Sequence, residues 1–133
     1  MKDMLVSQAK RLGVVTCRRN EPLKNVVRRM ADEDISALVV VEADGSLAGI
    51  ITRSDVVRAG LTSDSWPEEP VEAYMTANVI TVSPDARLAE VMRILLDRHI
   101  HRVVVVRQDG GRQVPVAVVS DSDLVCEMAD AVA

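Results

Sequence analysis

The chain has 133 residues, of which 48% are hydrophobic and only 2% aromatic, and its formal net charge at pH 7 is −4. An acidic chain with so few aromatic side chains lacks the basic surface and the base-stacking platforms of nucleic-acid-binding proteins, so we expect no nucleic-acid partner. No apolar run reaches the length of a membrane span, and the first eleven residues do not read as a signal peptide. These features predict a cytoplasmic protein without a membrane partner.

The first half of the chain predicts a short helix followed by one β-α-β-β-α unit. Apolar residues recur every three or four positions in the expected helices and form continuous runs in the expected buried strands. Asp44-Gly45 marks the turn of a hairpin. In chain order we expect a helix within residues 1–11, a strand at 14–16, a helix after Pro22, strands at 37–41 and 47–52, and a helix from 54 or 55 to about 60.

The second half predicts the same order of elements after a polar, proline-containing linker at residues 62–70. Pro115 removes a backbone donor from the last strand, so we expect a sheet edge or a bulge there. The expected elements are a short helix at 71–75, strands at 79–82, 103–107 and 114–119, a helix that starts at 83–85, and a last helix over 121–129. The predicted domains are therefore residues 1–61, an N-terminal segment plus the first repeat, and residues 71–133, the second repeat, which together form one paired module.

The two units are an internal sequence repeat, which outranks any single motif as evidence for the architecture. Equivalent residues are 65 positions apart before the second hairpin, as in Ile35 and Ile100, and 68 apart after it, as in Thr52 and Ser120. The three extra residues, Gly111-Arg112-Gln113, predict a longer hairpin loop in the second copy. The predicted fold is α/β, with two pseudo-symmetric β-α-β-β-α repeats and no continuous sheet through both.

Each repeat ends its last strand in a hydroxyl residue three positions before an aspartate: Thr52 precedes Asp55, and Ser120 precedes Asp123. This spacing puts a hydroxyl and a carboxylate beside the free backbone amides at the start of the next helix. The plainest role for these side chains is helix capping. A carboxylate at such a place can also accept both hydroxyls of a ribose, as in dinucleotide-binding folds. Two matching copies favour binding over capping alone.

The repeated patterns resemble those of a known family. Gly49-Ile50-Ile51-Thr52-Arg53-Ser54-Asp55, and Ile100-His101-Arg102 before a valine run, occur within a tandem pattern over about residues 12–130. The chain is thus similar to the cystathionine-β-synthase-type (CBS) domain pair, or Bateman module. The resemblance implies two repeats packed through their sheets, with clefts for adenosine-containing ligands such as AMP, ADP, ATP or S-adenosylmethionine.

The resemblance also implies which residues bind the ligand. Asp55 and Asp123 would hold ribose hydroxyls, and Thr52 and Ser120 would reach ribose or phosphate. The residues expected to flank the base are Val14, Val15, Thr16, Ile35, Ser36, Val79, Ile80, Thr81, Ile100 and His101. The implied protein is a stand-alone regulatory module, a homodimer, that binds an adenine nucleotide or adenosyl compound in the cleft between repeats and modulates an unidentified protein partner. No cofactor is required.

The chain departs from the family pattern at three places. Gly49 is matched by Ala117 in the second copy, which would let a ligand approach that backbone less closely. Lys10-Arg11 stands where the second repeat has Met75-Thr76. The run 120–123 carries an added carboxylate, which disfavours a polyphosphate unless a cation such as magnesium assists. We therefore favour the first cleft for an anionic ligand.

Other functions remain to be weighed against ligand sensing. The chief alternative is a structural module for dimerisation or protein interaction whose clefts stay empty. No Cys–His or Ser–His–Asp set has an informative spacing, so we expect no enzyme. We expect no metal site at His99 and His101. Cys17 and Cys126 lie in apolar stretches and are expected to be small buried thiols.

Overall fold

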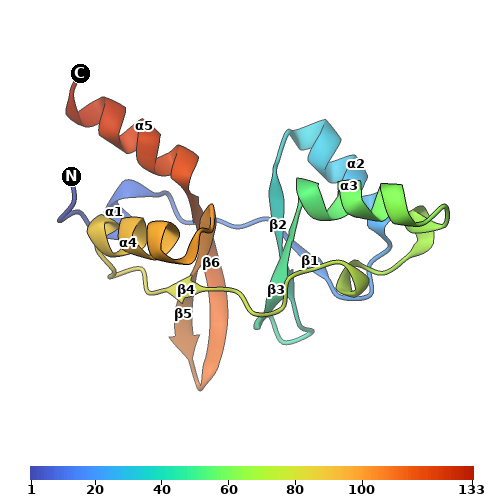
Figure 1. The fold of residues 1–133 in the computed structure, drawn as a ribbon. Helices are drawn as coiled ribbons and strands as arrows, with labels where there is room; N and C mark the ends of the chain where they lie inside the picture. The colour runs from blue at the N-terminus through green and yellow to red at the C-terminus, as the bar shows by residue number, and fades with distance from the viewer. The chain divides into compact units, whose positions relative to one another are not determined.

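The computed structural model describes residues 1–133 and contains two compact units. One unit is the continuous stretch Val15–Val79, and the other joins Met1–Val14 to Ile80–Ala133. Each unit has its own three-stranded sheet, in the order β1-β2-β3 in the first and β4-β5-β6 in the second (Figure 1). No strand pairing crosses between the two sheets, and the predicted fold class of two α/β repeats is confirmed.

The continuous unit follows the expected β-α-β-β-α order. Strand β1 runs parallel to β2, and β2 pairs with β3 in an antiparallel hairpin. The core lies between this sheet and its helices, where Leu23 and Val26 of the first helix meet Leu38 and Ile51 of the sheet. The elements are β1 (Thr16–Arg18), α2 (Leu23–Glu33), β2 (Ala37–Val41), β3 (Leu47–Thr52), α3 (Arg53–Thr62) and the 3-10 helices η1 (Trp66–Glu68) and η2 (Val71–Ala73).

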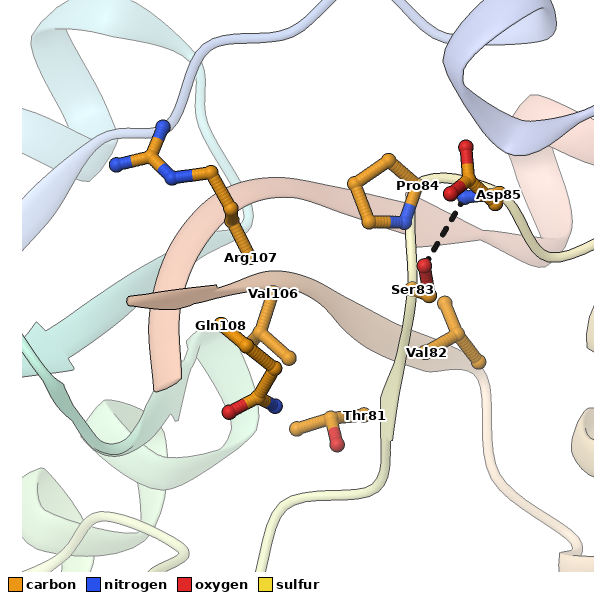
Figure 2. Close-up of a pocket in the computed structure, with 8 residues that line it drawn as sticks. All are labelled: Thr81, Val82, Ser83, Pro84, Asp85, Val106, Arg107 and Gln108. Atoms are coloured by element: carbon orange, nitrogen blue, oxygen red, sulfur yellow. Dashed lines mark hydrogen bonds between the residues drawn. The ribbon is translucent and has the colours of Figure 1, made fainter. Parts of the chain in front are cut away.

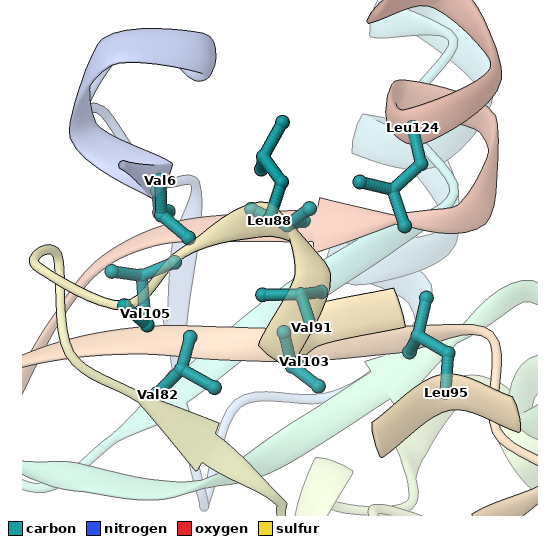
Figure 3. Packing of buried hydrophobic residues seen from close by; sticks show 11 residues of the cluster. Val6, Val82, Leu88, Val91, Leu95, Val103, Val105 and Leu124 are labelled. Carbon is teal, nitrogen blue, oxygen red and sulfur yellow. The ribbon is translucent and has the colours of Figure 1, made fainter. Parts of the chain in front are cut away.

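The second unit repeats this topology. Its elements are α1 (Val6–Ala9), β4 (Thr81–Val82), α4 (Leu88–Arg98), β5 (Arg102–Asp109), β6 (Arg112–Ser120) and α5 (Asp121–Ala131). Figure 3 shows its core, in which Leu88, Val91 and Leu95 of α4 pack with Val103 and Val105 of β5. Among all of these helices, none combines the length and the apolar character that crossing a membrane would require.

The helices α2 and α4 are amphipathic and end in the same way. Both end in a residue with left-handed backbone, Asp34 with φ 51° and His99 with φ 53°. The backbone N–H of each cap residue donates to a carbonyl of the last helical turn, that of Met30 or Leu95. His99 thus caps a helix, a role that its pairing with His101 in the sequence did not reveal.

The N-terminal segment belongs to the unit formed by the second repeat. Val6 is fully buried there, and its N–H donates to the Ala86 carbonyl at 2.8 Å. Leu12, which follows the helix, is exposed. The helix is only one turn long, and backbone hydrogen bonds join the segment to residues 84–89 around the start of α4, including one from the Leu88 N–H to the Met4 carbonyl.

The second hairpin differs from the prediction of a longer loop. The extra residues lengthen the two strands. The ladder continues past the bulge and pairs Arg107 with Val114, Gln108 with Gln113 and finally Asp109 with Arg112. Only Gly110 and Gly111 connect the strands, with φ of 56° and 84°. Two consecutive residues with positive φ make the tight turn whose twist matches that of the flanking strands, and two glycines adopt it without strain.

The bulge expected at Pro115 is present, but the proline is not its cause. The pairing register shifts between Val105 and Val106, where Val106 faces Pro115 on the edge strand β6. The first hairpin has the equivalent shift between Val40 and Val41 without any proline. Pro115 is therefore tolerated at a bulge that both repeats share.

Gly49 makes room for the chain itself. The segment just before β4 crosses β3 there, and Thr76 exchanges two backbone hydrogen bonds with Ile50, of 3.0 and 2.9 Å. A Cβ atom at Gly49 would lie 2.5 Å from the Thr76 carbonyl oxygen and 3.1 Å from the Met75 sulfur. The glycine is thus explained by this crossing, and not by the approach of a ligand as the sequence suggested.

We expect Gly49→Ala to destabilise the protein by about 1–3 kcal/mol, because the new methyl group overlaps backbone that is fixed by hydrogen bonds. Urea unfolding followed by circular dichroism measures the change. Gly60→Ala is the matched control, since Gly60 lies in α3 with no atom near its Cβ position. That change should stabilise the helix by about 0.5–1 kcal/mol. Equal losses in the two variants would contradict the packing explanation.

Candidate functional site

The two strand-to-helix junctions, β3–α3 and β6–α5, are built alike. Thr52 and Ser120 have extended backbone and precede the first residue of each helix. Their backbone N–H groups donate to Oδ2 of Asp55 and Asp123 at 2.8 and 2.9 Å, and each hydroxyl also lies 3.1 Å from the same oxygen. Both aspartates therefore have a capping role that ties the strand end to the first helical turn.

Asp55 is almost completely enclosed, with 9% of its side chain exposed. Its second oxygen, Oδ1, accepts a hydrogen bond from the Arg58 guanidinium at 2.8 Å. Arg58 also reaches toward the Tyr74 carbonyl, at 3.5 Å. Sequence reasoning missed Arg58, although its place three residues after an aspartate on a helix was a usable signal.

Asp123 is more open, with 35% of its side chain exposed. Its cation comes from outside its own helix, because Lys10 Nζ lies 3.0 Å from Oδ2. The residue that corresponds to Arg58 is Cys126, which cannot form an ion pair. The cavity beside Asp123 and Lys10 has only about 10 Å³, room for about one water. Lys10 had been noted only as a departure from the family pattern.

His101 lies at the second junction with Asp121. Its Nδ1 is 3.0 Å from Asp121 Oδ2, and this hydrogen bond lowers the pKa of the Asp121 carboxyl. The Asp121 N–H donates a backbone hydrogen bond to the His101 carbonyl. In the first copy, the Arg53 N–H donates in the same way to the Ser36 carbonyl. Thus Ser36 and His101 do lie against the two junctions. A pocket of about 400 Å³ adjoins the second, lined by Leu95, Leu96, His99, Ile100, His101 and Asp121.

The remaining predicted site residues serve mainly as framework. Ile35, Ile80, Ile100 and Val15 pack against the hydrophobic cores. The Val15 and Ile80 carbonyls accept from Val39 and Val104, which extends each first strand backward. The Thr16 carbonyl accepts a hydrogen bond from Arg29. Val14 and Val79 are both partly buried.

Thr81 faces a different hollow. It lines a pocket of about 420 Å³ between residues 81–85 and 106–108 (Figure 2). This pocket lies toward the far end of β5 from the second junction, because Arg102 at the start of β5 pairs with Ser120 whereas Val106 pairs with Pro115. Residues 83–85, where we expected the start of α4, form a turn in which the Asp85 N–H donates to Ser83 Oγ at 3.1 Å.

The two cysteines differ in their exposure to solvent. Cys17 is buried, and burial raises the pKa of its thiol to about 12, which keeps it protonated. Cys126 is exposed on α5, contrary to the expectation of a buried thiol, because it lies on the outer side of the helix. Both cysteines are free, and no group of three or more His, Cys, Asp or Glu side chains is placed to hold a metal ion.

Comparison with known proteins matches the repeat to a family model twice. The model described as CBS domain matches residues 6–62 and again residues 71–130. A 17.7 kDa protein of Acidianus ambivalens is 28% identical over 105 residues, which cover 79% of this chain and 63% of that protein. The chain spans less than two thirds of the length of the first curated relatives that it matches.

Solved structures agree with the fold. The CBS domain pair of protein MJ0100, crystallised with 5′-methylthioadenosine and S-adenosyl-L-methionine, has a TM-score of 0.83 and 26% identity, and the match covers 96% of this chain and 97% of that one. The CBS-domain protein ATU1752 of Agrobacterium tumefaciens has a TM-score of 0.78 and 25% identity, with 92% and 95% covered.

The difference in burial predicts different stability costs at the two junctions. Asp55→Ala should cost about 1–3 kcal/mol, because a buried acceptor is lost and Arg58 and the Thr52 N–H lose their partner. Asp123→Ala should cost less, about 0.5–2 kcal/mol, the usual loss for a helix cap that water can partly replace. Urea unfolding measures both, with the exposed Asp64→Ala as a neutral control. A larger loss of unfolding free energy in Asp123→Ala than in Asp55→Ala would contradict this prediction.

Proposed function

The chain belongs to the CBS domain family, and we propose that it is a regulatory module that binds an adenine nucleotide or another adenosyl compound at its strand-to-helix junctions. The observation that carries this proposal is the duplicated aspartate beside a hydroxyl, Asp55 with Thr52 and Asp123 with Ser120, held in one geometry in both repeats. The MJ0100 domain pair, which has the same fold, binds 5′-methylthioadenosine and S-adenosylmethionine. That ligand class supports the adenosyl assignment for this chain.

The proposed contacts follow from the donors and acceptors at each junction. A ribose offers two hydroxyl donors, and an ionised carboxylate has about four acceptor sites, of which the capping contacts use only some. Asp55 and Asp123 would accept these hydroxyls, while Thr52 and Ser120 would reach ribose or phosphate. Ser36 and His101, which contact the junctions through their carbonyls, would lie beside the ligand.

Each junction pairs its repeated aspartate with a basic side chain, which bears on ligand charge. Arg58 pairs with Asp55, and Lys10 pairs with Asp123. The sequence suggested that the added Asp121 would repel a phosphate at the second repeat. The Lys10 ammonium partly offsets that repulsion, and we propose that either junction accepts an anionic adenosyl ligand without magnesium.

Regulation would work by differential binding. A ligand that binds one conformation of the module more tightly shifts the population toward it, and a protein partner that docks on that conformation then responds. We propose no reaction for the chain itself, because its candidate groups are placed to bind and to cap helices rather than to activate a nucleophile. The identity of the partner is left to experiment.

We also propose a homodimer formed through helix faces. Val57 on α3 and Val125 on α5 occupy equivalent positions and are 70% and 62% exposed, and Leu96 on α4 is 75% exposed. An apolar pocket of about 310 Å³ lies between α4 and α5, lined in part by Leu96, Val125 and Met128. Large exposed apolar side chains on repeated helices favour burial against a second copy.

A structural module with empty sites is the second candidate function. The observation in its favour is that both aspartates already make capping and ion-pair contacts within the protein, and that only about 10 Å³ is open beside Asp123. In that case the duplicated junctions would hold helices in place for dimerisation or partner docking. Ligand binding distinguishes the two candidates.

Calorimetric titration with AMP, ATP and S-adenosylmethionine tests the proposed function. We expect at least one of them to bind, and Asp55→Asn and Asp123→Asn, titrated separately, each to weaken binding at its own junction about ten- to hundredfold through loss of a charged acceptor. Asp64→Asn serves as the control. Binding that survives unchanged in both folded variants would remove the ribose assignment, and no binding to the wild type would favour the structural module.

Sedimentation velocity tests the dimer. We expect the wild type to be dimeric at micromolar concentration, and Leu96→Glu and Val125→Glu to be monomeric, because a charge buried in an apolar interface lacks a partner. Leu12→Glu is the control, as Leu12 is exposed but lies outside these helices. A monomeric wild type, with or without nucleotide, rules the proposal out.

A further inference from the structure

We propose that the pocket between residues 81–85 and 106–108 is a second ligand site, separate from the two junctions, and that it binds a small zwitterion of the α-amino acid class. The pocket has about 420 Å³, within the range of small-molecule sites. It uses neither Asp55 nor Asp123, and the proposal does not rest on the adenosyl function.

The first repeat has an ion pair at the position that corresponds to this pocket. Residues 65 positions earlier include Arg19 and Glu42, which form a bidentate ion pair with distances of 2.7 and 2.8 Å. In the second repeat, Pro84 replaces Arg19 and Arg107 replaces Glu42. The acidic Glu42 is thus matched by the basic Arg107, and its partner Arg19 is matched by the uncharged Pro84. An internal ion pair thus occupies this position in the first repeat and is absent from the second.

Two charges of opposite sign border the open pocket without a partner. Figure 2 shows the Arg107 and Asp85 side chains on either side of the Pro84 ring. Both residues are exposed, and neither side chain makes an ion pair or a side-chain hydrogen bond. The carboxylate of Asp85 therefore does not take the role that Glu42 has in the first repeat, and both charges are available to a ligand.

The backbone keeps this pocket open. The β4–β5 ladder ends at the pair Val82–Val105, whereas β5 continues to Asp109. Pro84 lies where β4 would continue, and a proline has no N–H to extend the ladder. The side of β5 at Val106–Gln108 that faces residues 83–85 thus has no neighbouring strand.

The lining determines the chemistry of the ligand. A guanidinium binds a carboxylate through two parallel hydrogen bonds, and the Asp85 carboxylate accepts from an ammonium group. Val82, Pro84 and Val106 supply apolar surface for a short side chain, and the Thr81 hydroxyl and Gln108 amide supply neutral polar groups. A small molecule that carries a carboxylate, an ammonium group and a short side chain on one carbon is a free α-amino acid.

Calorimetric titration with the standard L-amino acids tests the site. We expect at least one of them to bind the wild type, and its N-acetyl and its amide derivative, which lack the ammonium and the carboxylate, to bind at least about tenfold more weakly. Arg107→Gln and Asp85→Asn should each weaken binding by a similar factor, whereas Arg93→Gln, an exposed arginine of α4, should not. Asp123→Asn should leave amino acid binding unchanged, whatever its effect on adenosyl ligands.

A swap variant provides the second test. Pro84→Arg combined with Arg107→Glu installs the ion pair of the first repeat, so we expect the variant to fold with at least wild-type melting temperature and to lose amino acid binding. The proposal is overturned if no amino acid binds the wild type, if the N-acetyl derivative binds as well as the free amino acid, or if a folded swap variant retains full affinity.

Discussion

The hydrogen bond from the backbone N–H of Thr52 or Ser120 to the aspartate three residues later is the contact on which each repeat depends. It fixes the last strand of the sheet to the first turn of the last helix, and so sets the direction of α3 and α5. That direction decides which helix residues enter the core and which remain exposed, as Ala59 and Val57 illustrate on α3. The same contact holds the carboxylate at the end of the sheet. Asp55 and Asp123 therefore serve both as helix caps and as candidate binding groups.

The two repeats keep this contact and have diverged in the charges around it. Asp55 obtains its cation from Arg58 on its own helix, whereas Asp123 obtains it from Lys10 on a remote segment. The Arg19–Glu42 pair has no equivalent near Pro84 and Arg107. Backbone geometry is thus shared through topology and capping, while ion pairs depend on single substitutions that leave the hydrophobic core untouched. Duplication followed by changes in surface charge gives one fold two electrostatically different halves.

Much of the fold was predictable because its signals are local or repeated. The valine runs of β2 and β5 and the spacing of Leu88, Val91 and Leu95 identified elements directly. The Thr52–Asp55 and Ser120–Asp123 junctions were found because the motif occurs twice. The ion pair of Lys10 with Asp123 was not predictable, since it joins residues far apart in the sequence. The role of Gly49 was missed for the same reason, because the Thr76 backbone that excludes a Cβ atom comes from a later segment, just before β4. The two-glycine turn at 110–111 was mistaken for part of a longer loop because insertions are more often placed in loops than in strands.

The joining of Met1–Val14 to Ile80–Ala133 has a consequence for synthesis of the chain on the ribosome. The unit Val15–Val79 is continuous, so all of its contacts are available once its last residue has emerged. The other unit joins two segments that are separated by the whole of the first, so the earlier segment, with Val6 among its buried residues, must wait for β5, β6 and α5 to be translated. Contacts between residues so distant in sequence form slowly, since their loop must close before burial compensates its entropy. The unit formed by two segments is therefore the late-folding half, and residues 1–14 stay without their packing partners until it forms.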